Sequence, residues 1–104
     1  MTNITELYRD DELIGFRIEG HANYSIPGRD IVCAAVSSLT INTINCLLQI
    51  GGVQPVVNED TESINYCVLG KVDVIAHTLL LAAHIGYKSI AEQYPENVIL
   101  TERR

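Results

Sequence analysis

Two short runs near the start of the sequence alternate between apolar and polar residues. They are residues 4–9 (ITELYR) and 13–19 (LIGFRIE), and the acidic triplet DDE separates them. Such alternation is typical of strands that bury one face. We therefore predict a β-hairpin. The candidates for its buried face are Ile4, Leu7 or Tyr8, Ile14, Phe16 and Ile18.

From Asp30 onward the apolar spacing changes to three and four residues, which is the period of an amphipathic helix. Gly51 and Gly52 supply a C-terminal stop. We therefore predict a long helix over residues 30–50. Its periodic positions are Val32, Val36, Leu39, Thr43, Cys46 or Leu47, and Ile50.

The second half of the chain repeats the sequence of hairpin and then helix. PVVNED (55–60) and INYCVLG (64–70) are β-prone runs joined by a polar TES, which predicts a second hairpin. Residues 71–93 have a helical pattern that Gly86 could loosen and that Pro95 ends. The run NVILTE (97–102) then reads as a last strand.

The predicted order of elements is therefore ββαββαβ. This order favours an α/β fold, a two-layer sandwich in which both helices cover one face of a small, mostly antiparallel sheet. At 104 residues with 47% hydrophobic and 19% charged side chains, residues 1–104 should form a single globular domain.

The net charge of −6 argues against direct binding to nucleic acid, because no basic patch is present to neutralise phosphates. An acidic surface would instead speed the encounter with a basic partner. Three cysteines without C-x-x-C spacing fit neither a disulfide framework nor a zinc ribbon, so we expect a reducing cytoplasm. We also expect no export signal and no membrane segment, since the first residues are acidic and the apolar run VIAHTLLLAAHI is short and interrupted by histidines.

The candidate chemistry lies in EGHANYSIPGRDIVCAAVSSL, residues 19–39. Gly20 and His21 should end the second strand, and Asp30 is a preferred N-cap residue directly before the helical run. Cys33 then lies in the first helical turn, where the helix dipole and unpaired N–H groups favour a thiolate. The alternative is an ordinary capped helix with a buried cysteine.

A nucleophilic cysteine needs a partner that takes and returns a proton, and His21 is the only histidine near Cys33 in the sequence. The N–H groups at the helix start could stabilise the oxyanion that forms when a carbonyl is attacked. Ser37 lies one turn beyond Cys33, where its hydroxyl could support the site or simply bond back to the Cys33 carbonyl.

The stretch GHANYSIPGRDIVCAAVSSL closely resembles the signature of the bacterial ribosomal-processing cysteine protease family, Prp. The matching features are Gly20-His21, the loop ending Gly28-Arg29-Asp30, and the helix start from Asp30 to Ser37. The diagnostic part of this resemblance covers about twenty residues. The length and the acidic character of the whole chain are also similar to those of the family.

The resemblance implies that Cys33 is the nucleophile and His21 the general base and acid, with Gly20, Asp30 and Ser37 supporting the site. It implies an endopeptidase without a cofactor that removes a short N-terminal extension from a large-subunit ribosomal protein, cutting after an aromatic residue. A homodimer is expected on the same ground, and also because two helices and one small sheet leave apolar stripes uncovered.

Other residues carry weaker signals. In the loop, Tyr24 could line a substrate groove or pack over the core, and Pro27 with Gly28 could let the loop open. His77 and His84, with Asp73 one turn before His77, could share a helix face and hold a metal, but such histidines are more often surface residues, and we expect no metal. Cys46 and Cys67 fit the core better than a site.

The main rival hypothesis is a non-catalytic dimeric binding module that holds a basic ribosomal segment in the same groove. Such a module should tolerate Cys33→Ser, whereas a protease should lose turnover. A thiol redox sensor ranks last, since no resolving cysteine lies at close spacing.

Overall fold

Five strands form one mixed sheet in the computed structural model, which describes residues 1–20 and 31–104. In the sheet the strand order is β3-β4-β2-β1-β5. Neighbours are antiparallel except that β1 and β5 run parallel. The strands are β1 (Thr2–Arg9), β2 (Glu12–Glu19), β3 (Val56–Glu59), β4 (Ser63–Cys67) and β5 (Val98–Arg103).

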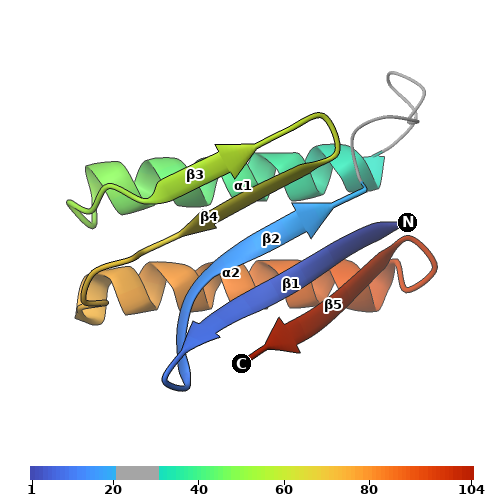
Figure 1. The fold of residues 1–104 in the computed structure, drawn as a ribbon. Helices are drawn as coiled ribbons and strands as arrows, with labels where there is room; N and C mark the ends of the chain where they lie inside the picture. Colours follow the sequence, from blue (N-terminus) through green and yellow to red (C-terminus); the bar gives the residue numbers. More distant parts are fainter. Residues whose placement is uncertain (21–30) are drawn as a thin grey trace.

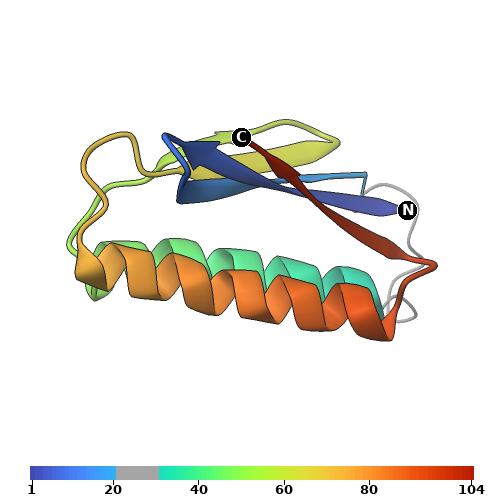
Figure 2. The same cartoon turned by 90° about the horizontal axis from the view of Figure 1, so that it is seen from below.

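The two helices, α1 (Ile31–Gln49) and α2 (Val74–Gln93), lie side by side against one face of this sheet (Figure 1). Seen from below, the sheet and the helix pair form two separate layers (Figure 2). The predicted two-layer α/β sandwich is thus confirmed, as is the order ββαββαβ.

The first hairpin turns through Asp10 and Asp11, which both adopt positive φ (51° and 62°). Two such residues between paired strands give the type I′ turn, whose twist matches that of the flanking strands. The register shifts between Leu7 and Tyr8. Ile4, Phe16 and Ile18 are buried as predicted, whereas Leu7, Tyr8 and Ile14 are only half-buried. Leu13 takes a buried position that the simple alternation missed.

Helix α1 buries the stripe Val32, Val36, Thr40, Thr43 and Leu47. Its observed end at Gln49 leaves Ile50 beyond the helix and 62% exposed, so the prediction that Ile50 continues the buried stripe is wrong. Gly52 follows in the left-handed region (φ 64°), which is the usual role of glycine after a helix.

Helix α2 begins at Val74, three residues later than predicted, because Asp73 caps it: its side chain accepts a hydrogen bond from the Ala76 N–H at 2.9 Å. The expected loosening at Gly86 does not occur, since the helix is continuous through it. A Cβ at Gly86 would lie 2.7 Å from Leu39 Cδ2, so this glycine allows close approach of the two helices.

A chain of hydroxyl groups joins the layers at the centre of the core. The Tyr87 hydroxyl lies 2.7 Å from Thr40 Oγ1 and 2.9 Å from the Tyr66 hydroxyl. Thr40 donates to the Val36 carbonyl at 2.8 Å. Because each hydroxyl has one proton, Tyr66 must then donate to Tyr87, and Tyr87 to Thr40. Both tyrosines are fully buried, and burial raises the pKa of each.

By length and composition alone, both helices would also fit membrane spans. In the structure both helices pack on one face of the sheet, and each also carries large apolar residues that stay exposed. The expectation that the chain has no membrane segment stays a prediction.

Candidate active site

Gly20 marks the point where the chain leaves the sheet at the end of β2. Its backbone adopts φ 78°, in the region that favours glycine, and its N–H donates to the Glu62 carbonyl at 2.9 Å. This bond ties the residue that follows β2 to the turn between β3 and β4. The position just before His21 is therefore fixed by backbone contacts as well as by sequence.

Cys33 is the third residue of α1 and so lies in the first helical turn, as predicted. Its side chain is half-buried. The start of α1 and the end of β2 lie at the same end of the molecule (Figure 1). The backbone N–H groups of a first helical turn have no partner within the helix, so a group that binds at a helix start can accept hydrogen bonds from them. This arrangement suits an anionic sulfur and a developing oxyanion equally.

Ser37 lies one turn beyond Cys33 and is also half-buried. It borders a small cavity of about 70 Å³ between α1 and the β3–β4 hairpin, together with Ile41, Glu59 and Ile64. Side chains at positions i and i+4 share a helix face. Cys33 therefore lies on the same flank of α1 as this cavity.

A second, polar cavity of about 290 Å³ lies next to Gly20. Charged side chains dominate its lining: Arg17 pairs with Glu19 at 3.1 Å, and Asp60 and Glu62 lie across from them. The N–H groups of Glu62 and Ser63, each 2.8 Å from Asp60 Oδ1, hold the pKa of that carboxyl below its usual value. With three carboxylates and one guanidinium, this cavity has an acidic balance.

The remaining candidates from the sequence lie outside the described residues. They are the proposed base His21, the proposed cap Asp30 and the loop positions Tyr24, Pro27 and Gly28. Whether His21 approaches Cys33 is therefore not tested by the geometry, and the roles of these five residues stay predictions.

Comparison with known proteins decides the family. The sequence matches the family model of the cysteine protease Prp over residues 1–99. The chain belongs to this family. The Prp family assignment made from residues 20–39 is thereby confirmed.

Several relatives are named ribosomal processing cysteine protease Prp. The protein from Bacillus subtilis is 31% identical over 49 residues, which cover 47% of this chain and 44% of that protein. The protein from Staphylococcus aureus is 26% identical over 89 residues, covering 80% of each chain. Among solved structures, SMU.848 from Streptococcus mutans is 29% identical with a TM-score of 0.87, covering 98% of this chain and 93% of that one.

The Prp fold is also seen in a protease from S. aureus solved with a substrate peptide. That structure has a TM-score of 0.89 at 22% identity and covers 99% of this chain and 100% of that one. At this identity the likeness establishes the shared fold. Two helices on a five-stranded mixed sheet are thus the Prp architecture.

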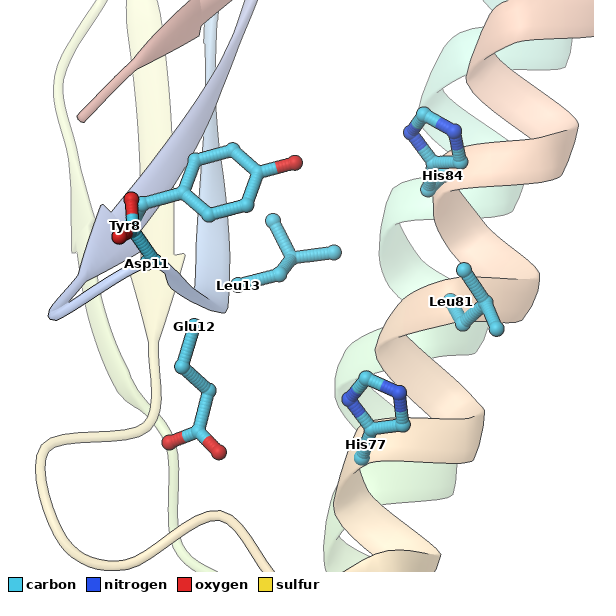
Figure 3. Close-up of a pocket in the computed structure, with 7 residues that line it drawn as sticks. All are labelled: Tyr8, Asp11, Glu12, Leu13, His77, Leu81 and His84. Atoms are coloured by element: carbon cyan, nitrogen blue, oxygen red, sulfur yellow. The ribbon is translucent and has the colours of Figure 1, made fainter.

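The metal site considered for Asp73, His77 and His84 has no matching cluster in the described part of the chain. Asp73 is occupied as the helix cap, and no group of three or more His, Cys, Asp or Glu side chains within residues 1–20 and 31–104 is arranged to hold a metal. His77 and His84 instead face the β1–β2 hairpin across a cavity (Figure 3). Cys46 and Cys67, expected in the core, are both half-buried.

Sequence reasoning missed one buried charged group. Glu6 is only 1% exposed under the helix layer, and its Oε2 contacts Nδ1 of His84. A signal existed, because Glu6 shares the inward-facing parity of Ile4 in an alternating strand. A carboxylate at such a position needs a partner from the facing layer.

Proposed function

We propose that this chain is a cysteine endopeptidase whose catalytic pair is Cys33 and His21. Membership of the Prp family supports a cysteine protease. The observation that carries the residue assignment is the position of Cys33 in the first turn of α1, at the end of the molecule where β2 leads through Gly20 to His21.

In the proposed reaction, the Cys33 sulfur attacks the carbonyl carbon of the scissile peptide bond while His21 takes the thiol proton. The N–H groups of the first helical turn stabilise the oxyanion. As the C–N bond breaks, His21 gives the proton to the leaving amine and a thioester remains on Cys33. Water then attacks the thioester with His21 as base, which releases the acid and restores the thiol.

The proposed substrate is a large-subunit ribosomal protein with a short N-terminal extension, cut after an aromatic residue. The relatives' name, ribosomal processing cysteine protease, supports a ribosomal substrate. The S. aureus homologue solved with a covalently linked product peptide supports a covalent route in the family. The net charge of −6 suits a basic partner.

We further propose that the chain forms a homodimer in the cytoplasm. Large apolar side chains remain exposed on both helices, and the sheet covers only one side of the helix pair. A second copy would bury them. Sedimentation at micromolar concentration should give twice the mass of one chain, and a monomer would contradict the proposal. The exposed residues are Ile31, Ile41, Leu48, Val74, Ile75 and Ile85.

The decisive experiment incubates the protein with the extended ribosomal protein and reads the product masses. We expect two fragments, with the new end directly after an aromatic residue. The matched control is Cys33→Ser, which should bind the substrate but release no fragment. If Cys33→Ser processes the substrate as fast as the native chain, Cys33 is not the nucleophile. If both chains bind the substrate and neither cuts it, the binding-module hypothesis replaces the protease.

A further inference from the structure

A cavity of about 320 Å³ lies between the β1–β2 hairpin and α2. It is at the hairpin turn, at the opposite end of the sheet from the β2 terminus at Gly20 and the start of α1 (Figure 1). Figure 3 shows Leu13 and the Tyr8 ring on the sheet side, facing Leu81 on the helix side. The cavity therefore has apolar walls but is separate from the candidate active site.

The polar groups of this cavity are two carboxyls, two imidazoles and one phenol. Asp11 and Glu12 come from the hairpin, and His77 and His84 from α2. None of the described residues that line it is lysine or arginine. Such a lining provides carboxylate acceptors beside apolar surface, which suits a cation carried on an aliphatic stem.

A buried carboxyl adds to the acidic character behind the wall. Glu6 contacts His84 and accepts a hydrogen bond from the Tyr8 hydroxyl. Burial and then the carboxylates of Glu6 and Glu102 raise the pKa of Tyr8. Glu6 thereby fixes one imidazole and one phenol in the lining, so the cavity is built on side chains held in place from below.

The chain itself shows that this region holds a guanidinium. The Arg104 guanidinium lies 4.0 Å from the centre of the Tyr8 ring, and its Nη1 is 3.2 Å from Asp11 Oδ1. Stacking on an aromatic face with a carboxylate at the edge is a favourable arrangement for arginine. Tyr8 and Asp11 both belong to the cavity lining as well.

We propose that this cavity is a second docking site, which binds an arginine or lysine side chain in the mature part of the substrate ribosomal protein. This inference rests on the proposed function, and it explains how a single basic protein would be selected among peptides with similar cleavage sites. Charge complementarity carries the choice of occupant, since Glu12 lies at the rim, Asp11 beside it already pairs with a guanidinium of the chain itself, and the whole chain carries −6.

The packing of the helices sets the spacing between the two sites. The Thr40–Tyr87 hydrogen bond aligns the antiparallel helices, so the cavity around Leu81 lies level with about residue 46 of α1. At 1.5 Å per residue this is roughly 20 Å from Cys33 along the helix axis. An extended substrate would need about six residues or more to connect the sites.

The test compares two substrates in the Asp11→Asn, Glu12→Gln variant. Asparagine tolerates the positive φ at residue 11, so the turn should survive. The substrates are the extended ribosomal protein and a synthetic peptide with five residues on each side of the cleavage site. We expect kcat/KM to fall at least about fivefold more for the protein than for the peptide, mainly through KM.

The matched control is Glu92→Gln, Glu96→Gln, which removes the same charge from exposed positions outside the cavity. It should lower kcat/KM for the protein less than about twofold. An equal loss in the control, or an equal loss for both substrates in the cavity variant, would overturn the docking site.

A binding measurement separates this inference from the proposed function. The probe is the mature ribosomal protein, already lacking its extension, titrated into the Cys33→Ala background with and without the cavity substitutions. Weaker binding of the cavity variant supports the docking site even if the native chain cuts neither substrate, which would end the protease proposal alone. Unchanged binding contradicts the docking site whatever the cleavage result.

Discussion

Two regions of α1 treat polar side chains in opposite ways. In the middle of the helix, Thr40 joins a hydroxyl chain with Tyr87 and Tyr66, and all three residues are at most 3% exposed. At its start, Cys33 and Ser37 are half-buried at the end of the two-layer sandwich, beside a cavity and the β2 terminus. The first region is closed to solvent, and the second is partly exposed.

The difference suggests that the middle of α1 serves stability and that its start serves activity. A buried hydroxyl chain with its bonds made fixes α1 against α2 and β4, because breaking any member leaves a polar group without a partner. The helix held in this way then presents its first turn at a defined position. Substitutions in the middle should therefore change stability, and substitutions at the start should change activity.

The largest expected effect is on catalysis. Cys33→Ala and His21→Ala should each reduce peptide cleavage by roughly three orders of magnitude or more, and the double variant should be little worse than either, because the pair acts as one unit. Thermal unfolding should change little, since Cys33 is only half-buried. Single-turnover rates with mass-resolved products measure this.

Two results would break the assignment of the pair. If the losses of the single variants multiplied in the double variant, Cys33 and His21 would act separately. If Cys33→Ala lowered the free energy of unfolding as much as a core substitution, Cys33 would serve the stability of the fold, as the middle of α1 does. Cys46→Ala is the matched control, because that thiol is half-buried on the same helix and outside the proposed site.

Breaking the hydroxyl chain should have the next largest effect. Tyr87→Phe removes one of the two hydrogen-bond partners of the Tyr66 hydroxyl, the other being Thr43, and should lower the free energy of unfolding by about 1–3 kcal/mol. The double variant Tyr66→Phe, Tyr87→Phe should cost less than the two singles together, since it leaves no orphaned phenol. Denaturant titrations of the three variants give these values.

If the middle of α1 serves stability and its start serves activity, Tyr87→Phe should leave the activity per folded molecule unchanged. Tyr94→Phe is the control, because it removes the hydroxyl of a half-buried tyrosine that takes no part in the Thr40–Tyr87–Tyr66 hydrogen bonds. A Tyr87→Phe protein that is as stable as the control, or that loses turnover while folded, would contradict the comparison.

Much of the fold was predictable because it depends on local periodicity. The alternation around DDE predicts strands and the three-and-four spacing after Asp30 predicts a helix, and each pattern also predicts which face of the element is buried. The predictions were wrong where a single residue, rather than the apolar periodicity, determined the local structure. Asp73 capped α2 later than the apolar pattern suggested, and Gly86 served contact with Leu39 rather than flexibility.

The candidate site was predictable only in part. The first-turn position of Cys33 follows from the helix start and is confirmed. The Glu6–His84 contact joins residues 78 positions apart, so no local pattern could reveal it. The cavity beside it requires the hairpin and α2 to be placed together, which is information about tertiary packing rather than about any one segment.

The smallest expected effect distinguishes the three thiols by their chemistry. At neutral pH, iodoacetamide should modify Cys33 about tenfold faster than Cys67, because the thiolate is the reactive form and a helix start favours an anion. Burial raises the pKa of Cys67, with Arg9 opposing it weakly, so less of this thiol is ionised at neutral pH. Peptide mapping by mass over time measures each rate.

Raising the pH sharpens the same test, because labelling should accelerate to a different extent at the different cysteines. A thiol with a raised pKa gains thiolate only at higher pH than an ordinary cysteine, so labelling of Cys67 should accelerate most between neutral and alkaline pH. The advantage of Cys33 should shrink accordingly. Cys46, whose thiol donates to Asn42 at 3.8 Å on the exposed side of α1, is the internal reference. If Cys33 reacted no faster than Cys46 at neutral pH, the start of α1 would not activate its cysteine, and the contrast between the two regions of the helix would lose its chemical basis.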